Sequence, residues 1–416
     1  MFQYREGRLY AEDVALERIA SEFGTPCYVY SRNDIVQAWQ AYDRAFGPRA
    51  HRIHYAVKAN ANLAVLDTLA RLGSGFDIVS GGELARVLAA RGEPRAVVFS
   101  GVGKSAAEME AALAADIGVF NIESSAELER LDGVAGRLGR RARIAVRVNP
   151  DVDAKTHPYI STGLDENKFG IPMADALDVY RAARALPNIE ITGVACHIGS
   201  QLTSLSPFAD ALARVMVLVA RLAEEGIELS HVDAGGGLGI RYRDEQPPSV
   251  EDYVATLCRA IPARYDICIE PGRSLVGAAG VLLTTVEYLK RTPKRHFAIV
   301  DAAMNDLIRP ALYEAWHEVL PLRAAPAGAP DTRYDLVGPV CESADFLATD
   351  RPLRLEPGSR LAIMCAGAYG QVMASNYNAR PRPPEVMVDG GRIHLVRARE
   401  TVAALYSGEA LLPDEL

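Results

Sequence analysis

The sequence predicts an α/β protein in which a (β/α)8 barrel is joined to a separate antiparallel β-sandwich or β-barrel domain. Two observations support this prediction. From about residue 50, short β-rich apolar runs alternate with longer segments whose apolar residues recur every three or four positions. After about residue 280, β-rich runs follow one another with only turns rich in Pro, Gly and Asp between them. The first pattern is typical of parallel strands with right-handed helical crossovers, and the second of antiparallel sheets.

Eight short apolar runs lie in the first part, which matches a closed barrel better than an open doubly wound sheet. They are HRIHYAV (51–57), GFDIVS (75–80), AVVFSG (96–101), GVFNIE (118–123), RIAVRVN (143–149), TGVACHIGS (192–200), HVDAGGG (231–237) and DICIEPG (266–272). Segments such as LAVLDTLARL (63–72) lie between them and have the spacing of amphipathic helices that cover a sheet. Strand-like pieces also occur in the first 30 residues, in GRLY and TPCYVYS. We therefore expect the barrel at 32–278 and the β domain at 1–31 and 279–416.

The composition limits the kinds of partner. The 416 residues include 45 Lys and Arg against 53 Asp and Glu, a formal net charge of −8, and the two signs are interspersed. This pattern argues against nucleic acid or an anionic membrane as the main partner. No apolar stretch approaches the roughly 18 residues of a membrane span, and charges occupy the N-terminus where a signal peptide has its apolar core. We expect a cytoplasmic protein with free cysteines and no metal site, because the six cysteines lack metal-ligand spacing.

Candidate reactive groups stand at the ends of the predicted barrel strands, where barrels of this kind carry their chemistry. They are Lys58 in YAVKAN, His197 and Ser200 in CHIGS, Gly235 to Gly237 in GGGLG, and Glu270 to Arg273 in EPGR. Each has an ordinary structural interpretation as well: the lysine as half of an ion pair, the glycines as a turn. Burial at the barrel mouth would lower the pKa of Lys58 toward that of a nucleophilic amine. The glycines would let backbone N–H groups approach an anion.

An amine, an imidazole, a phosphate cradle and a carboxylate on one barrel face suit pyridoxal 5′-phosphate. Lys58 would form the Schiff base and Glu270 would meet the pyridine nitrogen. A carboxylate there favours the protonated ring, which can absorb the carbanion left when an amino acid loses CO₂. An arginine at this place would disfavour it. Glu270 therefore favours decarboxylation over racemisation.

The motifs resemble those of a known family. YAVKAN, CHIGS, GGGLG, EPGR, CES-x-D (341–345) and GAYG followed by SNYN (367–378) have the order and spacing found in the barrel-type pyridoxal-phosphate decarboxylases. The segments at 149–172, 301–313 and 375–386 are similar to the diaminopimelate decarboxylases in particular. The resemblance runs from about residue 20 to the C-terminus. It implies decarboxylation of meso-2,6-diaminopimelate to L-lysine and CO₂, the last step of lysine synthesis.

The resemblance also implies a role for individual residues. Lys58 would carry the cofactor, His197 would stack on its ring and Glu270 would bind its nitrogen, while Cys341 would donate a proton. The cofactor's phosphate is assigned to Ser200, Gly236, Gly237, Gly272, Arg273 and Tyr369. The substrate is assigned to Arg273, Arg309, Tyr313, Glu342 and Tyr369. Members of the family are homodimers whose active sites take Cys341 and Glu342 from the partner chain, so the β domain would contribute to the substrate site and the dimer interface.

Several alternatives stay open at this stage. A related decarboxylase of ornithine, arginine or carboxynorspermidine would have the same fold, but the first two substrates have no distal carboxylate for Arg309 to bind. A barrel that merely binds pyridoxal phosphate would need neither a second domain nor Cys341 and Glu342. Asp77 and Arg147, at or near strand ends, orient Lys58 or the cofactor, or else form structural ion pairs. The charged loop 151–168 is either a lid or a surface loop.

Overall fold

The computed structural model describes residues 2–152, 168–324 and 331–413, and the chain forms two compact units. The barrel unit comprises Ile35–Val276. The β unit comprises Met1–Asp34 and Gly277–Leu416, so the barrel is inserted into the chain of the β unit. Most of the charged loop 151–168, which is either a lid or a surface loop, lies outside the described residues.

The predicted (β/α)8 barrel is confirmed. Each of the eight apolar runs forms a parallel strand, and the last strand pairs with the first, which closes the sheet. The strands, in their order around the barrel, are β5 (His51–Ala56), β6 (Gly75–Ile78), β7 (Val97–Phe99), β8 (Val119–Ile122), β9 (Ala142–Asn149), β11 (Ile189–Ala195), β12 (His231–Asp233) and β13 (Asp266–Ile269). A two-residue strand, β10 (Ile171–Pro172), adds to β9.

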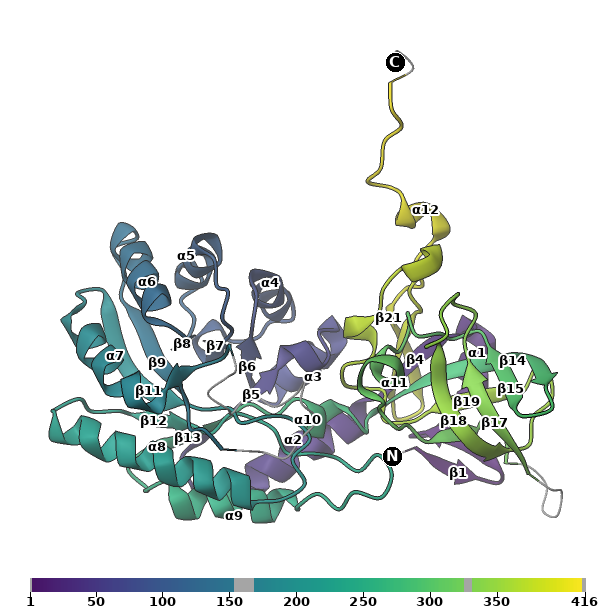
Figure 1. Ribbon diagram of the computed structural model, residues 1–416, viewed down its shortest axis with the longest axis horizontal. Coiled ribbons are helices and arrows are strands. Elements are labelled where there is room, and N and C mark those ends of the chain that lie inside the picture. The colour runs from purple at the N-terminus through teal and green to yellow at the C-terminus, as the bar shows by residue number, and fades with distance from the viewer. Residues whose placement is uncertain (1, 153–167, 325–330, 414–416) are drawn as a thin grey trace. The chain divides into compact units, whose positions relative to one another are not determined.

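Helices surround these strands, as Figure 1 shows. They are α2 (Arg32–Phe46), α3 (Leu63–Arg71), α4 (Gly81–Ala89), α5 (Ala106–Ala114), α6 (Ser125–Arg137), α7 (Met173–Ala185), α8 (Ser206–Glu224), α9 (Val250–Ala260) and α10 (Arg273–Val276), with 3-10 turns at η1 (Val57–Ala59) and η2 (Pro94–Ala96). Serine side chains cap several N-termini. Ser80, Ser105 and Ser124 each accept a hydrogen bond from a backbone N–H of the first turn. These caps fix where each strand-to-helix connection ends.

The β unit contains a large sheet and a small one. The large sheet comprises β4 (Cys27–Ser31), β14 (Gly280–Arg291), β15 (His296–Val300), β16 (Val319–Pro321), β17 (Thr332–Val337), β18 (Phe346–Leu353), β19 (Arg360–Ile363), β20 (Glu385–Asp389) and β21 (Arg392–Arg397). The small sheet comprises β1 (Gln3–Arg5), β2 (Arg8–Ala11) and β3 (Val14–Ala15). Short helices complete the unit: α1 (Leu16–Phe23), α11 (Arg309–Tyr313), α12 (Val402–Leu405), η4 (Gln371–Met373) and η5 (Tyr377–Ala379).

The N-terminal segment belongs to the β unit. Strand β4 lies between β14 and β20, and residues of both chain ends share one apolar core, for example Val29, Leu283 and Val386. The large sheet is mixed, which corrects the expectation of antiparallel pairing: β4 pairs in parallel with β20, and β15 with β17. Long connections separate these strands in the chain, so either direction is possible and local sequence does not decide between them.

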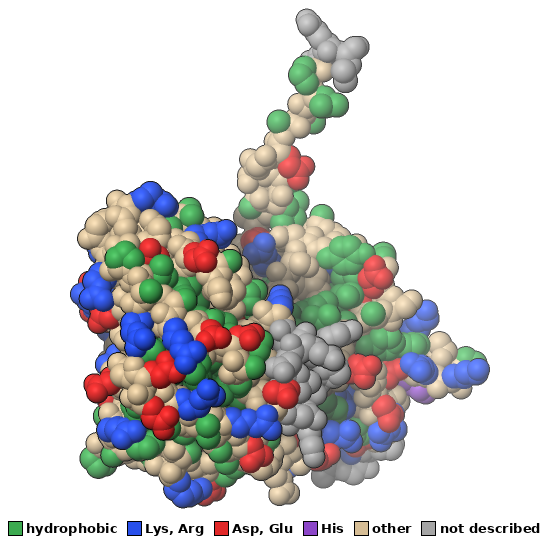
Figure 2. Space-filling model, turned by 60° about the vertical axis from the view of Figure 1, so that its left-hand side comes forward, with side chains coloured by type: hydrophobic (Ala, Val, Ile, Leu, Met, Phe, Trp, Pro, Cys, Tyr) green, Lys and Arg blue, Asp and Glu red, His purple; other side chains and the backbone are tan. Residues whose placement is uncertain are grey.

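The surface agrees with the charge pattern of the sequence. On the face of the barrel unit seen in Figure 2, Lys and Arg side chains are intermixed with Asp and Glu. None of the helices in the described parts of the chain has both the length and the apolar character that a membrane crossing requires.

Candidate active site

Lys58 lies at the C-terminal end of the first barrel strand, in the 3-10 turn η1 that directly follows β5. Its Nζ donates a hydrogen bond to Oδ2 of Asp77 at 2.6 Å. Asp77 comes from the neighbouring strand β6 and is fully buried, whereas 38% of the Lys58 side chain is exposed. The amine is therefore oriented by an ion pair but accessible. The second oxygen of Asp77 has no hydrogen-bond partner among the described residues, so this buried carboxylate has capacity for a further donor.

Glu270 follows β13 and is buried beside a second acidic residue, Asp233 at the end of β12. Burial first, and then the charge of Asp233, raise the pKa of Glu270 well above its ordinary value. Burial likewise raises the pKa of Asp233. Nδ2 of Asn121, at 3.3 Å, donates to Oε1 of Glu270. Two buried carboxyl groups cannot both ionise without a compensating cation, so this site is suited to a positively charged ring nitrogen.

His197 is held in its neutral form. Burial, followed by the charges of Arg147 and Lys58, lowers the pKa of its imidazole well below the ordinary value. Its Nδ1 accepts a hydrogen bond from the backbone N–H of Gly236 at 3.1 Å, which fixes the orientation of the ring. Arg147, considered above for an orienting role, forms an ion pair with Glu123 at 2.9 Å.

The glycine cluster after β12 lies against the neighbouring strand ends. A Cβ atom at Gly236 would lie 2.2 Å from the carbonyl oxygen of Glu270, and one at Gly237 would lie 2.6 Å from that of Gly199. Gly237 also has a φ of +118°, which side-chain-bearing residues rarely adopt. The absence of side chains is thus required here, because it lets the backbone come this close to the neighbouring strand ends.

Arg273 stands beside these glycines at the start of α10, directly after Gly272, and is only 6% exposed. Its Nη1 donates to the hydroxyl of Tyr242 at 2.7 Å and its Nη2 to Oγ of Ser200 at 3.0 Å. Both acceptors are hydroxyl oxygens, and these two contacts orient the guanidinium. A buried guanidinium held in this way, next to the glycine backbone, fits a phosphate group. The donor set at this end of the barrel therefore fits pyridoxal phosphate.

The remaining predicted residues belong to the β unit. Arg309, at the start of α11, is 6% exposed and donates from Nη1 to Nε2 of His317 at 3.1 Å. Nδ1 of His317 lies 2.8 Å from the Met364 carbonyl oxygen, to which it donates. His317 is thus a neutral tautomer that accepts from the arginine. Tyr313 ends α11, and Tyr369 has a φ of +55°.

Cys341 and Glu342 lie on an exposed loop between β17 and β18. The backbone N–H of Cys341 donates to Oδ1 of Asn378 at 3.1 Å, and the Tyr377 hydroxyl donates to Oε1 of Glu342 at 2.5 Å. The predicted residues thus form two groups. Those assigned to the cofactor lie, apart from Tyr369, in the barrel unit, and those assigned to the substrate's far end lie, apart from Arg273, in the β unit.

Sequence reasoning missed Asn121, Asp233 and Tyr242. The first two are polar residues near the ends of apolar strands, in GVFNIE and HVDAGGG. The strand-end argument that singled out Lys58 could have found them. Tyr242 lies in a loop and carries no comparable signal, because its contact with Arg273 arises only in the folded chain.

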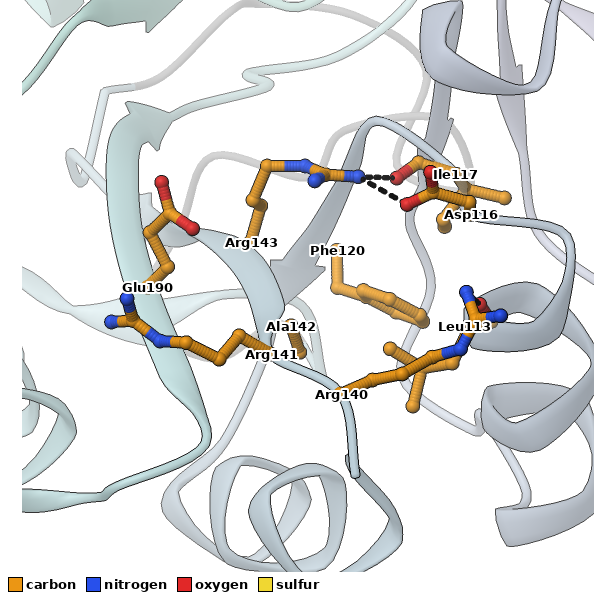
Figure 3. A pocket seen from close by; sticks show the side chains of 9 residues that line it. All are labelled: Leu113, Asp116, Ile117, Phe120, Arg140, Arg141, Ala142, Arg143 and Glu190. Carbon is orange, nitrogen blue, oxygen red and sulfur yellow. Dashed lines mark hydrogen bonds and ion pairs between the residues drawn. The ribbon is translucent and has the colours of Figure 1, made fainter. Parts of the chain in front are cut away.

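A pocket of about 240 Å³ opens at the opposite end of the barrel (Figure 3). It lies by the N-terminal ends of β8, β9 and β11, and three arginines line it. Arg140 donates to the Leu113 carbonyl oxygen, Arg141 to that of Ile189, and Arg143 binds Asp116. These contacts join helix ends to strands, so the three arginines have a structural role here. Among the described residues, no cluster of His, Cys, Asp or Glu could hold a metal ion.

A closed barrel that presents a lysine amine, a carboxyl pair and a phosphate-type cradle at the C-terminal ends of its strands defines the class of barrel-type pyridoxal-phosphate proteins. Residues 32–277 match the model of the family described as pyridoxal-dependent decarboxylase, pyridoxal binding domain. The diaminopimelate decarboxylase of Pseudomonas aeruginosa is 59% identical over 99% of both chains, and that of Vibrio cholerae is 56% identical over 99% of both. The chain belongs to the pyridoxal-dependent decarboxylases, in the family of the diaminopimelate decarboxylases, and pyridoxal phosphate is its cofactor.

Solved structures of this family have the same fold. Diaminopimelate decarboxylase from Helicobacter pylori, complexed with L-lysine, superposes with a TM-score of 0.91 at 43% identity and covers 95% of this chain and 99% of its own. The enzyme from M. jannaschii in co-complex with L-lysine has a TM-score of 0.95 at 39% identity, and the match covers 100% of this chain and 99% of its own.

Proposed function

We propose that this chain converts meso-2,6-diaminopimelate to L-lysine and CO₂ in a site built on Lys58. The observation that carries the proposal is the 59% identity to a diaminopimelate decarboxylase over 99% of both chains, in a chain whose barrel presents the donor set described above. We also propose a cytoplasmic location, which six free cysteines support because oxidising compartments favour disulfides.

The barrel residues hold the cofactor, which when bound supplies a protonated ring that takes up the electrons left by the departing CO₂. Lys58 attaches it, and Asp77 orients the Lys58 amine. Glu270 ionises against the protonated ring nitrogen and keeps the proton there, since an opposite charge at contact distance favours the charged form. His197, neutral and fixed by Gly236, would lie against the ring face. Tyr369 of the β unit would also contact the phosphate.

The phosphate is held by the second group of barrel residues. The Arg273 guanidinium binds it, with Ser200 and the backbone of Gly236, Gly237 and Gly272 around it. Arg273 also contacts the substrate. Because its two hydroxyl partners orient it, the guanidinium meets an incoming anion without a further ordering cost.

Substrate selection falls to the β unit, because diaminopimelate has an amino-acid head at each end. Arg309 binds the distal carboxylate, with Tyr313 and Tyr369 beside it, and Glu342 binds the distal ammonium. The Cys341 thiol donates a proton to the carbon that has lost CO₂. Ornithine and arginine have no distal carboxylate, so Arg309 would form no charge pair with these substrates.

One assay separates this function from its rivals. Purified protein supplied with pyridoxal phosphate should release L-lysine and CO₂ in equal amounts from meso-diaminopimelate. L-ornithine, L-arginine, carboxynorspermidine and L-lysine serve as control substrates. Release of CO₂ from one of these controls, with none from diaminopimelate, would assign the chain to a related decarboxylase. No turnover of any of them would favour a non-catalytic carrier of the cofactor.

We further propose that the protein is a homodimer in which Cys341 and Glu342 complete the partner's site. Both residues are exposed within their own unit. Glu342 also borders a groove of about 430 Å³ on the β unit that includes the apolar side chains of Phe297, Ile299 and Val340. Polar reactive groups next to an apolar groove suit a surface that a second copy covers.

Mixing two inactive variants tests the shared site. Lys58→Ala and Cys341→Ala each remove one essential group. If each site combines Lys58 of one chain with Cys341 of the other, a hybrid dimer has one intact site and one doubly defective site. Free subunit exchange should therefore restore up to about a quarter of the wild-type activity. Continued inactivity after exchange, verified with differently tagged chains, would contradict the shared site.

A further inference from the structure

The loop that carries Cys341 and Glu342 is exposed, yet its backbone is fixed at several points within the β unit. Asp345, which is 3% exposed, accepts hydrogen bonds from the N–H of Met304 at 2.7 Å and of Val340 at 2.8 Å. The side chain of Asn378 accepts from the N–H of Cys341 at 3.1 Å. These contacts set where the Glu342 side chain begins. They do not set where its carboxylate points.

The carboxylate of Glu342 is oriented by Tyr377. The Tyr377 hydroxyl donates to Oε1 of Glu342 at 2.5 Å. This hydrogen bond, together with the negative charge of Glu342, raises the pKa of Tyr377. Both side chains are exposed, and Tyr377 is 46% exposed. Exposed polar pairs of this kind contribute little to folding stability, so the contact has little structural value of its own.

Tyr377 in turn extends from a well-anchored segment. The N–H of Ser375 donates to the Asn305 carbonyl oxygen at 2.9 Å. Asn376 donates to Glu400 at 2.6 Å and accepts from Arg382 at 3.0 Å. These hydrogen bonds hold the backbone next to Tyr377 in place. The Tyr377 hydroxyl can therefore hold the flexible Glu342 side chain in one orientation.

We propose that Tyr377 is a positioning residue that determines specificity by aiming the Glu342 carboxylate at the distal ammonium of the substrate. The inference rests on the proposed function, in which Glu342 binds that ammonium. The Tyr377 hydroxyl donates to Oε1 of Glu342, and Oε2 of Glu342 can then accept a hydrogen bond from the substrate's ammonium. A carboxylate already held in one rotamer avoids the ordering cost that a free glutamate side chain would add on binding.

Two ligands that differ only in the relevant group provide the test. L-Lysine has the distal head of diaminopimelate, with both its ammonium and its carboxylate. 6-Aminohexanoate is the same molecule without that α-ammonium, so its distal head has only the carboxylate. Tyr377→Phe should lower kcat/KM for meso-diaminopimelate by about ten-fold, mainly through KM, which is typical of a lost hydrogen bond to a charged group. The inhibition constant of L-lysine should rise by a similar factor. That of 6-aminohexanoate should stay within two-fold of wild type.

Two further variants complete the experiment. Tyr406→Phe removes the hydroxyl of another exposed tyrosine, in the segment after α12, and should change none of these constants. Glu342→Gln with Tyr377→Phe should be no worse than Glu342→Gln alone, because the two residues act as one unit.

The possible results separate the inference from the function on which it rests. Equal weakening of L-lysine and 6-aminohexanoate, unchanged constants in Tyr377→Phe, or additive losses in the double variant would each overturn the role of Tyr377 while leaving the decarboxylase assignment intact. A wild-type protein that does not turn over diaminopimelate would overturn the proposed function, and this inference with it.

Discussion

Lys58→Ala should abolish the visible absorption of the bound cofactor and reduce turnover to near zero. The reason is the position of the amine: Lys58 follows β5 at the mouth of the barrel and is held by Asp77 at 2.6 Å while 38% of its side chain stays exposed. A substitution that removes the covalent anchor removes the orientation of the cofactor along with it. Absorption spectra of the purified variant and lysine release from diaminopimelate measure the two effects.

Lys104 is the obvious substitute amine in the barrel, and its contacts argue against such a role. Its Nζ donates to the carbonyl oxygens of Gly101 and Asn121 and to Oε1 of Glu127, all at 2.7–2.8 Å. A matched control is Lys294→Ala, which removes an exposed lysine between β14 and β15 and should leave spectrum and activity as in wild type. If Lys58→Ala still carried cofactor that borohydride can fix to the chain, another lysine would be the anchor.

Arg309→Ala should lower kcat/KM for diaminopimelate by about 30-fold or more while the cofactor spectrum is retained. The guanidinium is 6% exposed and is oriented by a neutral His317. Removing one partner of a buried charge pair costs about 2–5 kcal/mol, which corresponds to such factors. Steady-state kinetics with diaminopimelate, together with a cofactor titration, would measure both quantities.

The control for Arg309 is Arg333→Ala in the same unit. Arg333 forms an exposed ion pair with Asp350, and pairs of this kind contribute little, so its kinetics should match those of wild type. Wild-type kinetics in Arg309→Ala as well would show that no distal carboxylate binds there. The distal carboxylate would then have to bind at another residue of the site.

The sequence predicted the barrel because a local pattern determines it. Each apolar run, such as 51–57 or 266–272, is one continuous stretch of sequence with the composition of a buried strand. The same reasoning found Lys58 and Glu270, since their strand-end positions follow from the runs. Local sequence does not reveal which side chains meet across the barrel. The contact of Asn121 with Glu270 depends on how strands far apart in the chain align around it.

The mixed β sheet shows the same limit. The TPCYVYS piece near the N-terminus reads as a strand, but its parallel pairing with β20 depends on a segment at the other end of the chain. Tyr377 lies within the SNYN motif, which the sequence singles out only through a resemblance. Its hydrogen bond to Glu342 joins two segments that are far apart in the chain, so local sequence does not predict it.

The insertion of the barrel into the β unit imposes an order on biosynthesis. Strand β4 is complete once residue 31 has been made, but its partner β20 is among the last strands, and Tyr30 and Glu385, which hydrogen-bond at 2.7 Å, are 355 residues apart. The barrel unit, Ile35–Val276, is synthesised as one continuous segment. The barrel can therefore fold before β14 and β20, the strands that pair with β4, have been made. The nascent chain can thus form the barrel unit, with Lys58 and Glu270, before Arg309, Cys341 and Glu342 have been made.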